Sequence, residues 1–131
     1  MFDIINPAAL GEPKGWNNGM LAPAGGRILF VAGQTARGGD GVIVDGGIAA
    51  QWAQALANVL AVVREAGGDV ANIGRMTIFI TSRADYLANR SALGPVWRAA
   101  MGRHFPAVAV VEVSGLVDDG AVVEIEATAV L

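Results

Sequence analysis

The sequence predicts a single α+β domain in which two helices pack on one face of a β-sheet. Short apolar runs show the two-residue alternation of strands, and two longer segments show helical periodicity. These segments follow one another as strands, helix, strand, helix and two strands. The length of 131 residues fits one domain over residues 1–131, and the apolar fraction of 53% supports a packed core.

The expected strands are apolar runs bounded by turn residues. In the clearest run, Met76, Ile78 and Ile80 alternate with residues of the opposite face. The glycines at positions 38, 39 and 41 predict a hairpin turn rather than a phosphate-binding loop, because no strand–loop–helix pattern with a following lysine surrounds them. Strands are expected at residues 3–5, 27–32, 75–81, 108–113 and 121–130, with an extended segment at residues 16–21.

Two segments are expected to be helical. Residues 48–66 place Trp52, Leu56 and Leu60 on one apolar stripe, and the Gly-Gly pair at positions 67 and 68 ends this helix. Residues 85–101 form the second segment. Gly94 and Pro95 interrupt it, so we expect either a kink there or two shorter helices.

The strand at residues 108–113 is apolar on both of its faces. A sheet of this kind needs cover on both sides, and two helices cover only one. A second subunit is the simplest cover for the other face, so the sequence predicts a homo-oligomer. The alternative is that the alternating apolar residues merely reflect a composition rich in Ala and Val.

Composition and charge exclude several classes of function. The net charge of −3 and the lack of a basic run disfavour a nucleic-acid partner. Without cysteine, and with His104 as the only histidine, neither a thiolate nucleophile nor a multi-histidine metal site is available. No apolar run is long enough to span a membrane, and no signal peptide is visible, so we expect a cytoplasmic protein.

Glu124 and Glu126 are the most informative polar residues, because they lie two apart in the last strand and therefore share a face. A carboxylate held among apolar groups can accept and release a proton in catalysis. The alternative is that both are structural acids that bind backbone amides or arginines. The sequence also offers Arg27, Arg75 and Arg103 as possible anion-binding groups.

Seven short motifs occur in an order that resembles the RidA/YjgF family, also labelled L-PSP endoribonuclease, over nearly the whole chain. They are Asn6-Pro7 with Leu10, FVAGQ at residues 30–34, QALANV at 54–59, AGG at 66–68, TIFIT at 77–81, FPA at 105–107 and VEIEA at 123–127. The resemblance implies a chorismate-mutase-like α+β fold and a homotrimer with small-molecule clefts between its subunits. It also implies hydrolysis of enamines and imines such as the 2-aminoacrylate tautomers, without a cofactor.

The resemblance further implies which residues form the site. Glu124 matches the glutamate that orients the attacking water, and Gly33 matches a family carbonyl. Four positions depart from the family: Val108 replaces the arginine that clamps the substrate carboxylate, Val110 replaces a cysteine, Trp16 replaces a tyrosine and Gly94 falls at the position of an asparagine. Valine cannot reproduce a bidentate guanidinium contact.

We therefore expect a divergent member of the family that keeps the cleft and Glu124 but takes a different ligand. Three functions follow: hydrolysis of another, more apolar enamine or imine, non-catalytic binding of a small molecule, and endoribonuclease activity. The acidic composition disfavours the last of these. The expected partners are a small-molecule ligand and two further copies of the chain, with no metal, nucleic acid or membrane.

Overall fold

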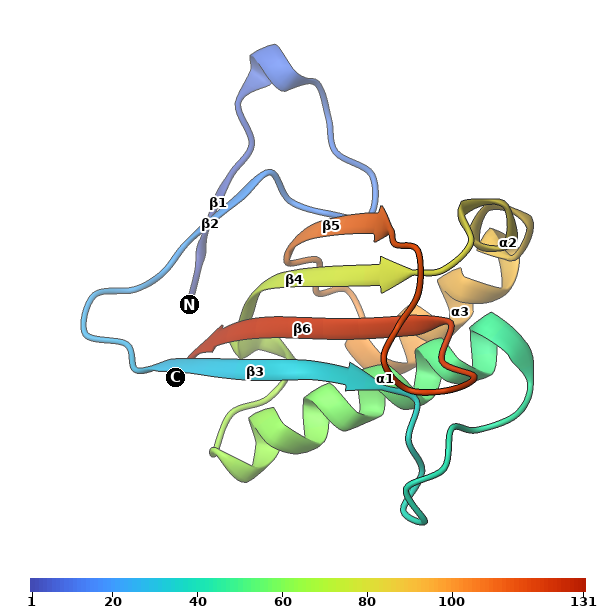
Figure 1. Ribbon diagram of the computed structural model, residues 1–131. Helices are drawn as coiled ribbons and strands as arrows, with labels where there is room; N and C mark the ends of the chain where they lie inside the picture. The colour runs from blue at the N-terminus through green and yellow to red at the C-terminus, as the bar shows by residue number, and fades with distance from the viewer.

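The computed structural model describes residues 1–131 and contains a four-stranded mixed sheet with the strand order β3-β6-β4-β5 (Figure 1). The central strands β6 and β4 are antiparallel to each other, β3 is antiparallel to β6, and the edge strand β5 is parallel to β4. A separate two-stranded antiparallel sheet joins β1 to β2. The strands are β1 (Asp3–Ile5), β2 (Gly19–Leu21), β3 (Ile28–Thr35), β4 (Ile73–Ile80), β5 (Ala107–Glu112) and β6 (Val123–Val130).

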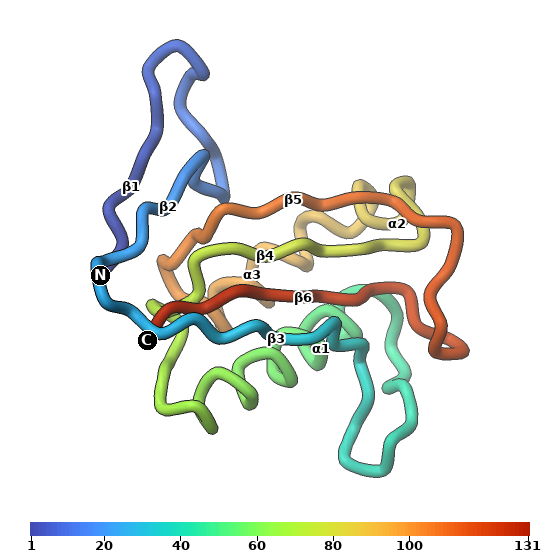
Figure 2. The backbone as a smooth tube through the Cα atoms, turned by 60° about the vertical axis from the view of Figure 1, so that its left-hand side comes forward, coloured from blue at the N-terminus to red at the C-terminus, as the bar shows by residue number.

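Three helices lie on one side of the four-stranded sheet, which confirms the predicted α+β class (Figure 2). Helix α1 contacts β3 and β6, and α3 packs beside α1. The helices are α1 (Gly47–Glu65), α2 (Arg83–Ala88) and α3 (Arg90–Met101), and short 3₁₀ turns occur at Ala8–Leu10 and Val70–Asn72. None of the helices combines the length and apolar character that a membrane crossing requires.

The hydrophobic core lies between α1 and the helix-facing side of the sheet. Alternate residues of β6 are buried there, beginning with Val123 and Ile125, and so are Met76, Ile78 and Ile80 of β4. Leu56, Val59 and Val63 of α1 complete the contact, as the predicted apolar stripe requires.

The second helical segment departs from the prediction in detail. It divides into α2 and α3 at Asn89, whereas Pro95 lies inside α3. The Asn89 side chain donates hydrogen bonds to the Asp85 carbonyl and carboxylate, which closes the first helix locally. The proline removes only one N–H, the one that would reach the carbonyl of Ser91, and Ser91 is exposed on the helix surface.

The other face of the sheet has no helix on it. Large apolar side chains of β3 are exposed there, with Phe30 78% and Ile28 62% accessible in the single chain. Val111 of β5 is also exposed. An uncovered apolar face of this kind fits the predicted assembly of several copies, which stays a prediction.

Candidate functional site

Glu124 lies on the helix-free face of the sheet, where β6 passes between β3 and β4. Its Cα pairs with Phe79 of β4 on one side and with Thr35 of β3 on the other. The half-buried carboxylate makes no hydrogen bond or ion pair within the chain. Glu124 is therefore an unengaged acid on a face that is otherwise rich in apolar side chains.

Gly33 lies directly beneath the Glu124 carboxylate. The β3–β6 register shifts between Val31 and Gln34, so Gly33 belongs to a bulge next to the acid. A Cβ atom at this position would collide with Oε1 of Glu124. Glycine is thus needed here for close approach, and the structure brings Glu124 and Gly33 together.

Glu126 also faces the helix-free side, two residues farther along β6. It pairs with Thr77 and lines a shallow hollow of about 230 Å³ together with Phe30 and Arg75. The Thr77 hydroxyl is buried without a hydrogen-bond partner. The shared face of the two glutamates follows from the two-residue repeat of a strand.

Val108 and Val110 lie on the opposite, helix-facing side of β5. They pair with Met76 and Ile78, two core residues of β4. Together with Trp16, they line a pocket of about 360 Å³ between β5, α3 and the N-terminal loop. We call this cavity the aromatic pocket, because three tryptophans, Tyr86 and Phe105 form much of its wall.

Hydrogen bonds from three asparagines hold the loop that carries Trp16. The Asn17 side-chain amide donates to the carbonyl of Phe105 at 2.6 Å, and the backbone N–H of Asn17 donates to the carbonyl of Pro106 at 3.2 Å. Asn6 binds both Asn17 and Asn18. This network places Trp16 beside the start of β5 and explains the early Asn-Pro motif structurally.

A single chain therefore does not bring Glu124 to the predicted valines. Glu124 and Gly33 lie on one face of the sheet, and Val108, Val110 and Trp16 line a pocket on the other. The alternation within each strand was readable from the sequence, but the relation between strands depends on their pairing register.

Two arginines that the sequence analysis did not select, Arg90 and Arg98 of α3, line the aromatic pocket together with Lys14. Of the arginines that were selected, Arg75 lines two shallow hollows, one on the helix-free face and one beside Trp16. Arg103 does not line the aromatic pocket. The missed signal was the spacing of Arg90, Gly94 and Arg98, which repeats every four residues and defines one helix face.

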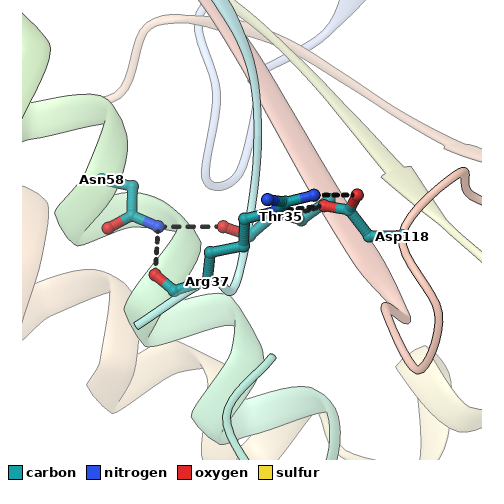
Figure 3. A network of polar contacts seen from close by, with 4 residues as sticks. All are labelled: Thr35, Arg37, Asn58 and Asp118. Atoms are coloured by element: carbon teal, nitrogen blue, oxygen red, sulfur yellow. Dashed lines mark hydrogen bonds and ion pairs between the residues drawn. The ribbon is translucent and has the colours of Figure 1, made fainter. Parts of the chain in front are cut away.

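A polar network fixes the end of β3 next to Glu124 (Figure 3). Asp118 accepts hydrogen bonds from Arg37 Nε and Nη2, at 2.9 and 2.6 Å, and from the Thr35 hydroxyl. Asn58 of α1 donates to the carbonyls of Thr35 and Arg37, both at 2.9 Å. The hydrogen bonds from Arg37 and then from Thr35 lower the pKa of Asp118 to about 2. The network thus positions Thr35 opposite Glu124.

Neither His104 nor a cluster of metal ligands forms a second candidate site. His104 Nε2 donates to the carbonyl of Ile73 at 2.6 Å, so the imidazole joins the segment after α3 to the start of β4. No group of three or more His, Cys, Asp and Glu side chains is arranged to hold a metal ion.

Comparisons with known proteins agree with the resemblance seen in the motifs. The family model described as Endoribonuclease L-PSP matches residues 10–131. A 2-iminobutanoate/2-iminopropanoate deaminase of Capra hircus is 31% identical over 125 residues, which cover 95% of this chain and 83% of that enzyme.

Two solved structures show the same architecture. A Rid-family protein of Yersinia pestis has a TM-score of 0.86 and 30% identity, with 99% of this chain and 98% of that one covered. The E. coli protein TdcF with bound serine has a TM-score of 0.68 and 28% identity, with 92% and 91% covered.

Proposed function

The chain belongs to the Endoribonuclease L-PSP family, and from that membership we infer that it hydrolyses a reactive imine, or the enamine tautomer of one. The observation that carries this proposal is the unengaged Glu124 carboxylate lying against Gly33. The relative named 2-iminobutanoate/2-iminopropanoate deaminase supports the reaction class. The substrate differs from 2-aminoacrylate, because Val108 stands where the family arginine would clamp a small carboxylate.

The site is completed between two copies of the chain. One copy supplies Glu124 and Gly33 from its helix-free face, and its neighbour supplies Trp16, Val108 and Val110. This arrangement accounts for two half-sites that one sheet holds apart. It also covers exposed apolar side chains such as Phe30, whose burial favours association.

Glu124 acts as the general base in this scheme. Its carboxylate takes a proton from water as the water oxygen bonds to the imine carbon, and the C=N π electrons move to nitrogen. The nitrogen takes up that proton and a second one from the new hydroxyl group. The C–N bond then breaks and releases ammonia, and the carbonyl forms. One water is consumed for each carbonyl and ammonia produced, and no cofactor enters the balance.

Replacing Glu124 with Gln tests the catalytic role, because glutamine keeps the size of the side chain but cannot accept the proton. An amino-acid oxidase generates imines from a panel of amino acids, and semicarbazide traps those that remain. We expect the wild-type protein to lower early semicarbazone formation, and Glu124→Gln to lose at least about 100-fold of this activity. Serine dehydratase supplies 2-aminoacrylate as the comparison substrate, on which the wild type is expected to be slow.

Light scattering of the same samples separates catalysis from assembly. A Glu124→Gln protein that keeps the wild-type mass but loses turnover supports the catalytic assignment. A variant that dissociates, or that keeps full activity, makes Glu124 structural. A wild type that hydrolyses no imine in the panel but binds small acids supports the non-catalytic function instead.

A further inference from the structure

We propose that the aromatic pocket binds a flat aromatic ring carrying a carboxylate, so that the substrate is the imine of an aromatic 2-oxo acid. The assignment of this ligand as a substrate rests on the proposed function, whereas the ligand class rests on the pocket itself. Two features carry the proposal: aromatic walls and unpaired cations.

The walls are built to contact a flat ring. All three tryptophans of the chain, Trp16, Trp52 and Trp97, line this one pocket. Trp52 stacks on Tyr86 with ring centroids 5.7 Å apart, and Trp97 stacks on Phe105 at 6.3 Å. The volume of about 360 Å³ lies at the small end of ligand pockets, which suits one ring with a short side chain.

The charge of the pocket is opposite to that of the protein. The chain carries a net charge of −3, yet the only ionised side chains that line the pocket are Lys14, Arg90 and Arg98. Neither arginine side chain makes a hydrogen bond or ion pair within the chain. Two free guanidinium groups, in a pocket to which the same copy adds no acidic side chain, favour a carboxylate ligand.

Both arginines lie on the face of α3 that lines the pocket. Arg90, Gly94 and Arg98 share one face of the helix, and Gly94 between them has no side chain. A Cβ at Gly94 would lie 3.6 Å from Nη1 of Arg98. The guanidinium group of Arg98 therefore lies over Gly94, on the part of α3 between the two arginines.

The pocket lining is also poor in hydrogen-bond acceptors. Among the side chains that line the pocket, only the Tyr86 hydroxyl carries an oxygen atom. A ligand that carries a carboxylate complements this lining, whereas a cationic ligand does not.

The probe for this proposal is 3-phenylpropanoate, compared with its neutral amide 3-phenylpropanamide and with the aliphatic acid butanoate. Because every tryptophan lines the pocket, intrinsic fluorescence reports occupancy directly, and calorimetry provides an independent affinity. We expect 3-phenylpropanoate to bind at least about tenfold more tightly than either comparison compound, since each lacks one of the two recognised groups.

Two variants test the contacts. The double variant Arg90→Gln/Arg98→Gln is expected to lose about tenfold or more in affinity for 3-phenylpropanoate but not for the amide. Arg103→Gln removes a charge that does not line the pocket and is expected to leave both affinities unchanged.

The outcomes separate this inference from the proposed function. Equal affinity for acid and amide, equal affinity for 3-phenylpropanoate and butanoate, or no binding at millimolar concentration each overturns the inference. If small imines are hydrolysed in that case, the proposed function still stands. Binding of 3-phenylpropanoate without hydrolysis of any imine retains the ligand class and refutes the proposed function.

Discussion

Replacing Gly33 with Ala should reduce catalysis far more than stability. The new Cβ atom would overlap Oε1 of Glu124, and the carboxylate must move by about 1 Å to restore ordinary contact. A displacement of this size in a reacting group costs about 100-fold in rate. Gly33 does not have a positive φ angle, so alanine fits the backbone itself.

The stability cost should be small, because all the atoms that must yield belong to one side chain, that of Glu124. Overpacking a rigid core costs about 1–3 kcal/mol. Here the clash is weaker, and alanine also stabilises the protein by lowering the entropy of the unfolded chain. We therefore expect the free energy of unfolding to change by less than about 1 kcal/mol. The assay combines thermal melting with imine hydrolysis, again with the amino-acid oxidase as the source of imines.

Gly39→Ala is the matched control, since a Cβ there meets nothing within 4 Å and the residue lacks a positive φ angle. It should leave both activity and melting temperature unchanged. Full activity in Gly33→Ala would refute the reasoning, because Glu124 would then tolerate displacement. Equal losses of stability and activity would show that Gly33 supports the fold rather than the acid.

Two further predictions concern assembly and acid stability. Light scattering at micromolar concentration should give about three times 13.4 kDa. Phe30→Asp places a charge on the helix-free face and should lower that mass. A well-folded wild-type monomer would remove the basis for a shared site. Asp118 has a pKa of about 2 in the folded protein, below the value of about 3.9 in an unfolded chain, so its stabilising effect is complete above about pH 4 and is lost as the pH falls through 2. Asp118→Asn should therefore melt at a lower temperature than the wild type at pH 7, and the difference should shrink between about pH 4 and pH 2. The control Asp119→Asn changes an exposed neighbouring residue and should melt at the same temperature as the wild type. A difference for Asp118→Asn that is constant with pH would show that ionisation of Asp118 is not the cause.

The sequence by itself determined the local periodicities and the faces that they define. In β6 the alternation of Val123 and Ile125 with Glu124 and Glu126 was visible directly, and the structure buries the first pair and leaves the second partly open. The apolar stripe of α1 and its end near Gly67 were equally readable. These features depend on neighbours within a few residues, which the sequence lists in order.

Elements whose ends depend on competition between alternative hydrogen bonds were predicted in less detail. The division between α2 and α3 falls at Asn89, where a side chain bonds back to Asp85, and Pro95 is accommodated inside α3. The hairpin turn predicted at the glycine cluster does form, with backbone hydrogen bonds from Gly38 to Val42 and from Val44 to Ala36, but its arms are too short to add strands to the sheet. Each outcome depends on which hydrogen bonds the folded chain can complete, and composition alone does not determine this.

Only the tertiary structure decided which residues share a site. Pairing of β4 with β5 in one register, and with β6 in another, puts Val108 and Glu124 on opposite faces of the same sheet. Packing of α3 beside α1 then places Arg90 and Arg98 around a pocket that also contains Trp16 from the N-terminal loop. Strand register and helix packing join residues that are far apart in the chain, so no spacing along the sequence encodes the result.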